Sequence, residues 1–331
     1  MSGKKVLYSD EAPKGYREVL ERRKPEGFAV CYWKEMNKQQ QQVALREADY
    51  FLVGGEQIGE ELLLQAKKVR FIQRTGVGVN NIDIETATRL HIPVSIIPTG
   101  NSVAVAELAI LFPLALYRNL MIANNAIKAG RWLNSELRPI SYELEGKTHG
   151  FVGFGNIGRE TAKRSKVFGT NIIYYDVCRA PLQREQDVGA VHLPLEEVLK
   201  RSDILSIHVP LTQETRGLIG MKELALMKST ALLINVARGG IVVESDLYLA
   251  LKGGIIAGAG IDTWESEPIN PDNPLLTLDN VIATPHCAAG TIDTFNKCVH
   301  LSFENIQKAE KDNRPQFVVN NIDSARSITS V

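Results

Sequence analysis

The sequence has 331 residues, of which 44% are hydrophobic and 23% charged, and its 38 basic and 38 acidic side chains give a formal net charge of zero. This composition is typical of an ordinary globular protein long enough for about two domains, and the balanced charge argues against a nucleic-acid-binding surface. The four cysteines show no metal-ligand spacing, so we expect no metal site. The N-terminus lacks a secretory signal, and the most apolar run, 108–117, is too short to cross a bilayer. We therefore expect a cytoplasmic protein without a membrane partner.

The first part of the chain alternates short apolar runs with amphipathic stretches. The apolar runs are rich in valine, isoleucine and aromatic residues, which is typical of strands, and the stretches between them carry helix formers. This alternation predicts a parallel sheet covered by helices on both faces, and we assign residues 1–101 to one domain. The expected strands are 5–8, 28–33, 50–54, 70–74 and 92–97.

A long helical stretch follows Asn101 and begins VAVAELAILFPLALY. Asn101 and Ser102 are candidate N-caps, because a side-chain oxygen there can accept from the free N–H groups of the first turn. Pro113 lacks a backbone donor, so we expect the helix to bend or break at that residue. The apolar residues of this stretch form either a subunit interface or part of the core.

The motif GFGNIG (153–158) follows an apolar strand and precedes a helical sequence. Its first glycine allows a tight turn, its second lets the backbone approach a pyrophosphate, and its third lets the helix pack against the strand. Phosphate oxygens would bind the free N–H groups of the helix. Asp176 ends the next strand at about the 20-residue spacing expected for the acid that binds the adenosine ribose. The segment therefore predicts a dinucleotide site.

Polar residues follow the carboxyl ends of the later strands, which are mostly continuous apolar runs as buried parallel strands require. In open α/β sheets, ligands bind outside the carboxyl ends of the strands. We therefore expect Arg238, Asp262, Glu267 and His286 to line one crevice with the glycine turn, with His208 beside it. The expected strands include 203–209, 231–237, 255–262 and 281–285.

These side chains suit hydride transfer between a nicotinamide and a 2-oxo acid. The planar guanidinium of Arg238 suits the substrate carboxylate, and His286 suits proton transfer to the carbonyl oxygen. A carboxylate beside a histidine raises the histidine pKa, and Glu267 is available for that part. Asp262 would orient either the nicotinamide carboxamide or Asn235.

Several segments, in order over nearly the whole chain, resemble the D-isomer-specific 2-hydroxyacid dehydrogenase family. The resemblance implies an α/β fold in which a Rossmann domain (102–287) is inserted into a flavodoxin-like, parallel-sheet substrate domain (1–101 and 288–331), with hinges near Asn101 and His286. Because the sequence ends at Val331, we expect no regulatory domain of the kind that some phosphoglycerate dehydrogenases carry. The segments are RTGVGVNNID (74–83), NSVAVAE (101–107), GFGNIG (153–158), HVPLTQETRGLI (208–219), MKSTALLINVARGGIV (227–242), DTWESEP (262–268) and TPHCAAG (284–290).

The resemblance also implies roles for individual residues. Arg238, Glu267 and His286 are the expected catalytic residues, with Glu267 as the partner of the acid/base His286. The substrate would contact Val77, Gly78, Asn101, Arg238 and His286. Arg74 either contacts a phosphate or distal carboxylate of the substrate or is a surface residue. The expected NAD-binding residues are Gly153, Gly155, Asn156, Ile157, Gly158, Asp176, Val209, Pro210, Thr215, Val236, Ala237, Arg238, Asp262 and His286.

Alternatives remain open within this assignment. Glu267 argues against formate, because formate dehydrogenases of this family carry Gln at that position, and 3-phosphoglycerate, glyoxylate or hydroxypyruvate remain as substrate types. Asp176 should repel a 2′-phosphate and favour NAD over NADP, although Arg179 could offset that repulsion. We expect a homodimer. The alternative function is an NAD(H)-sensing interaction protein similar to transcriptional co-repressors. We find no signal for the exposed peptide-binding groove that such a protein needs.

Overall fold

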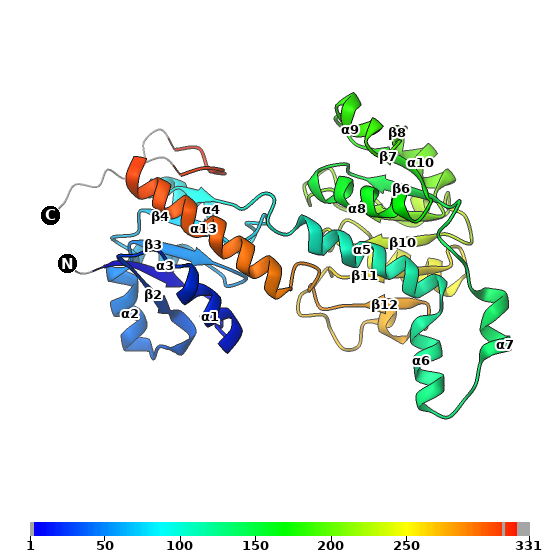
Figure 1. The fold of residues 1–331 in the computed structure, drawn as a ribbon, viewed down its shortest axis with the longest axis horizontal. Helices are drawn as coiled ribbons and strands as arrows, with labels where there is room; N and C mark the ends of the chain where they lie inside the picture. Colours follow the sequence, from blue (N-terminus) through cyan, green and yellow to red (C-terminus); the bar gives the residue numbers. More distant parts are fainter. Residues whose placement is uncertain (1–2, 313–314, 323–331) are drawn as a thin grey trace. The chain divides into compact units, whose positions relative to one another are not determined.

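The computed structural model describes residues 3–312 and 315–322. The chain divides into two compact units, unit 1 with residues 1–101 and 291–331 and unit 2 with residues 102–290 (Figure 1). The expected second boundary, after Cys287, differs from this division, because Ala288 belongs to unit 2. Its N–H donates to Asp262 Oδ2 at 3.0 Å, and its side chain packs in an apolar cluster of that unit. The insertion of one α/β unit into another confirms the expected fold class.

Unit 1 is built on a five-stranded parallel sheet of order β2-β1-β3-β4-β5, the flavodoxin-like arrangement. The expected strand over 92–97 is reduced to two residues. Helices on both faces of the sheet bury an apolar core. It includes Leu7, Phe51 and Ile72 on one side and Val6, Leu52 and Phe71 on the other. The elements are β1 Lys4–Tyr8, α1 Lys14–Arg23, β2 Phe28–Tyr32, α2 Lys38–Glu47, β3 Tyr50–Val53, α3 Glu60–Gln65, β4 Phe71–Arg74, α4 Ile84–Arg89, β5 Val94–Ser95 and α13 Ile292–Asp312.

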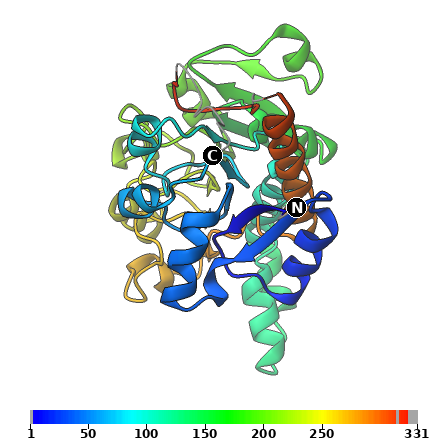
Figure 2. The same cartoon turned by 90° about the vertical axis from the view of Figure 1, so that its left-hand side faces the viewer.

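Helix α13, which lies far from the other elements of unit 1 in sequence, packs beside α1 (Figure 2). The ring of Phe295 stacks on that of Tyr16, with centroids 3.8 Å apart, and meets Tyr8 edge-on. The side chain of Asn296 accepts a hydrogen bond from Arg23 Nε at 2.9 Å. These contacts explain how the C-terminal segment completes the domain begun by residues 1–101.

Unit 2 is built on a seven-stranded parallel sheet of order β12-β11-β10-β9-β6-β7-β8. The order reverses at β6, as in a Rossmann domain. Strand β8 is not predicted by the sequence, because it has only two residues and lies at the edge of the sheet. The elements are α5 Ser102–Tyr117, α6 Leu120–Lys128, α7 Asn134–Leu137, β6 Thr148–Val152, α8 Asn156–Val167, β7 Asn171–Tyr175, α9 Leu182–Gln186, β8 Val191–His192, α10 Leu195–Arg201, β9 Ile204–Ile207, α11 Met221–Leu224, β10 Leu232–Asn235, α12 Glu244–Lys252, β11 Gly258–Ile261 and β12 Val281–Ala283.

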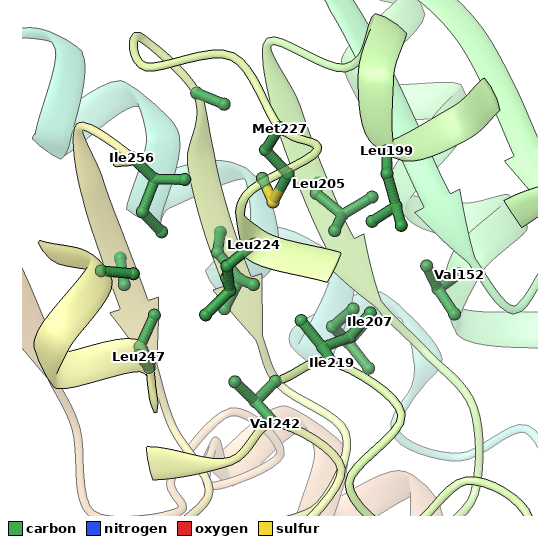
Figure 3. Packing of buried hydrophobic residues seen from close by; sticks show 14 of the residues in the cluster. Val152, Leu199, Leu205, Ile207, Ile219, Leu224, Met227, Val242, Leu247 and Ile256 are labelled. Atoms are coloured by element: carbon green, nitrogen blue, oxygen red, sulfur yellow. The ribbon is translucent and has the colours of Figure 1, made fainter. Parts of the chain in front are cut away.

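The largest core of unit 2 lies between the sheet and the segments that carry α10, α11 and α12 (Figure 3). Every residue of β9 is buried, which confirms the expectation of a strand covered on both faces. Side chains such as Leu205, Ile219 and Leu247 pack together there, and burying each contributes about 1.5–3 kcal/mol. This core holds the carboxyl ends of the strands in fixed positions.

Helix α5 corrects two expectations. It continues through Pro113 to Tyr117, and the chain turns only at Asn119, whose φ is 49°, before α6 begins at an angle of 63°. Phe112 and Pro113 are both buried, so packing against the sheet maintains the helix despite the missing donor. Neither Asn101 Oδ1 nor Ser102 Oγ has a hydrogen-bond partner among the described residues, so neither side chain caps α5.

No single helix in the described ranges combines the length and the apolar composition that a membrane span needs. Helices α5 and α6 meet both requirements only as a bent pair.

Candidate active site

Adjacent strands of unit 2 bring the expected polar residues to one edge of the sheet. Strands β6, β9, β10, β11 and β12 are parallel neighbours, so their carboxyl ends meet there. The residues that follow these ends are Gly153, His208, Arg238, Asp262 and His286, respectively.

The glycine turn between β6 and α8 has a different steric requirement at each glycine. Gly153 has a φ of 93°, which favours glycine, and a Cβ there would lie 2.8 Å from the backbone of His208. A Cβ on Gly158 would lie 2.5 Å from the Gly153 oxygen, whereas a Cβ on Gly155 meets no atom within 4 Å. Gly153 and Gly158 are therefore required by the fold. Gly155 keeps open the space before the N-terminus of α8, where a pyrophosphate could bind.

Asp176 follows β7 and holds this turn. Its Oδ2 accepts a hydrogen bond from Phe154 N at 2.7 Å, and its Oδ1 accepts from Cys178 N at 3.2 Å. The ring of Phe154 stacks on that of Tyr174, with centroids 4.1 Å apart. The carboxylate is thus fixed beside the turn, in the position expected for an acid that faces a ribose.

The remaining expected cofactor residues lie at the start of α8 and in the loops after β9 and β10. Asn156 Oδ1 accepts from Arg159 Nη2 at 2.8 Å, and Ile157 packs against the apolar cluster under α5. After β9, Thr215 Oγ1 donates to Pro210 O at 2.6 Å, which closes the loop that contains Val209. The N–H of Ala237 donates to Asn235 Oδ1 at 3.1 Å, and Ala237 is preceded by the buried Val236.

Arg238 is half-buried in the loop after β10. Its Nη1 donates to Ala237 O at 2.6 Å. Burial lowers the pKa of the guanidinium, and the charge of Glu267 opposes that effect. The buried Asn235 side chain holds the loop from the other side, because its Nδ2 donates to Arg238 O at 3.1 Å. Arg238 is therefore presented by a loop whose backbone is fixed by one amide side chain.

His286, in the loop after β12, and Glu267, in the loop after β11, are in direct side-chain contact. His286 Nδ1 lies 2.7 Å from Glu267 Oε2. The other carboxylate oxygen, Oε1, accepts from Trp264 N at 3.0 Å, so the glutamate is anchored. This contact leaves the second ring nitrogen of His286, Nε2, on the opposite side of the ring from Glu267.

The backbone of His286 is held in a left-handed conformation, with a φ of 50°. Such a conformation costs about 1–3 kcal/mol in a residue other than glycine and persists only when the surroundings impose it. Asp262 imposes it here: its backbone oxygen accepts from His286 N at 2.8 Å, Oδ1 accepts from Cys287 N at 2.9 Å, and Oδ2 accepts from Ala288 N at 3.0 Å. Oδ1 also accepts from Thr284 Oγ1 at 2.6 Å.

Asp262 is completely buried, and its carboxylate is occupied by the loop that carries His286. The sequence suggested a role toward Asn235 or a nicotinamide. The contact to Asn235 is made by the Asp262 backbone N–H, which donates to Asn235 O at 2.9 Å. Contact of Asp262 with NAD stays a prediction.

Unit 1 carries the other expected substrate residues. Arg74 Nε donates to Gly78 O at 2.9 Å, and Nη1 donates to Val53 O at 3.2 Å, so this side chain braces the loop after β4. Val77 in that loop is exposed. Asn101 ends the first segment of unit 1, and its Oδ1 is buried without a hydrogen-bond partner among the described residues.

Three other polar or aromatic residues are structural. His149 is fully buried between Ser165 Oγ and Ser206 Oγ, at 2.8 and 2.7 Å, and burial lowers its pKa to about 3. His192 Nε2 contacts Asp176 O at 3.2 Å, and Trp264 Nε1 donates to Thr284 O at 3.0 Å. Within the described part of the chain, no group of His, Cys, Asp and Glu residues could hold a metal ion.

Sequence reasoning missed the supporting roles of Asn235, Thr284 and Asp262. Asn235 and Thr284 are each followed within three positions by an expected site residue. Asp262 instead faces the loop of His286 across the edge of the sheet. The signal available was the position of Asn235 and Thr284, three residues before Arg238 and two residues before His286, respectively. The bonds themselves depend on which loops the sheet brings together.

Comparison with known proteins agrees with this arrangement. The model for the D-isomer specific 2-hydroxyacid dehydrogenase NAD-binding domain matches residues 110–288. The glyoxylate reductase of Thermococcus litoralis is 38% identical over 325 residues, which cover 96% of this chain and 96% of that protein. The D-3-phosphoglycerate dehydrogenase of Methanocaldococcus jannaschii is 41% identical over 278 residues, 83% of this chain but 52% of that protein. The chain thus matches only about half the length of such phosphoglycerate dehydrogenases.

Solved structures show the same fold. A glyoxylate reductase from Paecilomyes thermophila superposes with a TM-score of 0.82 at 28% identity, covering 96% of this chain and 99% of that one. The NAD-complexed D-isomer specific 2-hydroxyacid dehydrogenase of Lactobacillus delbrueckii ssp. bulgaricus gives a TM-score of 0.80 at 26% identity, covering 96% of this chain and 100% of that one. The chain belongs to the D-isomer specific 2-hydroxyacid dehydrogenase family and carries its NAD-binding domain.

Proposed function

We propose that the protein is an NAD-dependent oxidoreductase that interconverts a D-2-hydroxy acid and its 2-oxo acid. The observation that carries this proposal is the 2.7 Å contact between His286 Nδ1 and Glu267 Oε2, in the same unit as Arg238 and the glycine turn. A histidine fixed by a carboxylate beside a nicotinamide site is suited to proton transfer coupled to hydride transfer.

In the reducing direction, bound NADH supplies the hydride. Arg238 binds the substrate carboxylate through its guanidinium and orients the adjacent carbonyl group. His286 donates a proton from Nε2 to the carbonyl oxygen, while Glu267 holds Nδ1 and stabilises the charged ring. In the oxidising direction the same nitrogen accepts the proton of the hydroxyl group.

The glycine turn and Asp176 support NAD as the cofactor. The open space at Gly155 and the N-terminus of α8 suit the pyrophosphate. The Asp176 carboxylate suits ribose hydroxyl groups and repels a 2′-phosphate. Val209, Pro210, Thr215, Val236 and Ala237 lie in the adjacent loops and are proposed to complete the cofactor site.

Glyoxylate and hydroxypyruvate are the proposed substrates, ahead of 3-phosphoglycerate. The glyoxylate reductase of Thermococcus litoralis is matched along 96% of its length, and the hydroxypyruvate reductase of Thermotoga maritima along 85% of its length. The contacts of Arg74 with Gly78 O and Val53 O support a role in shaping the substrate loop rather than in binding a phosphate. Val77, Gly78 and Asn101 are proposed to contact the substrate.

The test is NADH oxidation with glyoxylate, hydroxypyruvate, phosphohydroxypyruvate and pyruvate, measured as kcat/KM. We expect the highest value with glyoxylate or hydroxypyruvate. A preference for phosphohydroxypyruvate would contradict the substrate proposal and leave the reaction class intact. Tight NADH binding without turnover of any 2-oxo acid would favour the alternative, an NAD(H)-sensing interaction protein.

A homodimer is proposed on the basis of α6 and the segment after it. This part of the chain projects from the sheet of unit 2 (Figure 1) and carries exposed apolar side chains. Met121 and Ile127 are exposed on α6, and Trp132 is 77% exposed. A cavity of about 390 Å³, lined by residues such as Leu120, Met121 and Ile140, adjoins this surface. Ile127→Glu should give a monomer by light scattering, whereas Val167→Glu, at a more exposed position elsewhere in unit 2, should not. The free state of all four cysteines supports a reducing, cytoplasmic location.

A further inference from the structure

Arg179 lies in the loop after β7, three positions beyond Asp176. From the sequence, Arg179 could offset the repulsion between Asp176 and the 2′-phosphate of NADP. The structure adds a bidentate contact, because Nε and Nη2 of Arg179 donate to the two carboxylate oxygens of Glu185, each at 2.9 Å. The guanidinium is therefore already paired with a carboxylate.

Glu185 is not an ordinary surface acid. Its side chain is only 5% exposed, although that of Arg179 is 63% exposed. Its Oε1 also accepts a hydrogen bond from Tyr174 Oη at 2.6 Å, and the same hydroxyl accepts from Ala180 N at 2.9 Å. Arg179 and Tyr174 together lower the pKa of Glu185 to about 2, so the carboxylate is charged at neutral pH.

Tyr174 connects this pair to the cofactor turn. Its ring stacks on Phe154, whose N–H is the one bound by Asp176 Oδ2. The loop that carries both Asp176 and Arg179 is thus fixed at both ends: Cys178 N donates to Asp176 Oδ1 at 3.2 Å, and Ala180 N donates to Tyr174. The position of the Arg179 side chain is set by Glu185 within a rigid loop.

We propose that Glu185 is a positioning residue for cofactor selectivity, which holds Arg179 away from the ribose so that the charge of Asp176 is left to exclude the 2′-phosphate of NADP. This inference rests on the proposed NAD-dependent function. An exposed arginine near the 2′-position would otherwise bind that phosphate through its planar fork. The bidentate contact with Glu185 occupies two of the five N–H donors of Arg179, fixes the direction of its side chain and offsets its charge.

The test compares NADH and NADPH affinities, measured by nicotinamide fluorescence, for the full-length protein and its variants. In Glu185→Gln the amide oxygen can still accept from Tyr174, but the second acceptor for Arg179 becomes a donor. We expect NADPH to bind about tenfold more tightly relative to NADH, the change that one new charge-assisted contact produces. Arg179→Met in the Glu185→Gln background should remove that gain.

Two further variants separate this effect from others. Asp187→Asn makes the same change of charge directly after the same short helix, but Asp187 contacts Arg184, so the affinity ratio of this variant should stay that of the wild type. Arg179→Met alone should also leave the ratio unchanged, because Glu185 already holds the guanidinium and offsets its charge. A loss of NADPH affinity in this single variant, or an unchanged ratio in Glu185→Gln, would overturn the proposal. Failure of the wild-type protein to bind NADH would instead contradict the proposed function.

Discussion

Asp262→Asn tests how His286 is held. The substitution keeps the size of the side chain, and Oδ1 can still accept from Thr284 and Cys287. The new amide group, however, would point a donor at Ala288 N–H, where Oδ2 now accepts at 3.0 Å. One charge-assisted hydrogen bond is lost inside a fully buried site, and two donors come to face each other.

The expected cost is about 2 kcal/mol, the value of a buried hydrogen bond to a charged group. For a cooperative unit of about 150–250 residues this corresponds to a decrease in Tm of about 4–8 °C. The left-handed backbone of His286 depends on the same residue. A shift of the ring by about 1 Å would then lower kcat by up to about 100-fold.

The assays are thermal unfolding, steady-state kinetics and NADH titration of the same preparation. We expect a lower Tm and a lower kcat with little change in the Kd for NADH, because the carboxylate is occupied by the loop. Asp279→Asn, at an exposed position of the same unit, is the control. A wild-type Tm and kcat would refute the argument that Asp262 holds the loop. A large rise in the NADH Kd alone would show that Asp262 acts on the cofactor instead.

Three further predictions concern other parts of unit 2. His286→Gln should lower kcat by about 10²–10⁴, the range for general acid–base catalysis, while NADH binding measured by fluorescence persists; full activity would exclude the proposed acid. Gly158→Ala should unfold or strongly destabilise the protein in thermal melts, because its Cβ would lie 2.5 Å from the Gly153 oxygen, whereas Gly155→Ala should melt normally yet bind NADH more weakly. Burial lowers the pKa of His208 from 6.5 to about 3, so the unfolded state binds more protons than the native state below pH 6.5. Stability should therefore be complete above pH 6.5 and fall as the pH decreases toward 3, and His208→Phe should show a shallower decline in urea titrations at several pH values.

The placement of the site residues could be predicted because it depends only on strand direction. Arg238 and Asp262 each follow an apolar run typical of a buried strand, and His286 follows a further short apolar run, the edge strand β12. Parallel strands bring their carboxyl ends to one edge of the sheet. The glycine spacing similarly predicted the turn before α8. In both cases the sequence pattern and the local geometry are directly linked, and no knowledge of side-chain packing was needed.

The features that the sequence could not predict depend on contacts between distant segments. Pro113 would end an isolated helix, but burial against the sheet keeps α5 continuous. The sequence around Arg179 does not show its partner, because the contact with Glu185 forms only when α9 packs against the loop after β7. The contacts of Asp262 could not be predicted for the same reason, since nothing in its local sequence shows that its partners are the N–H groups of the loop after β12. Asp262 and Glu185 bear on how the proposed site is held rather than on which groups it contains. The sequence could therefore suggest the chemistry but not the contacts that support it.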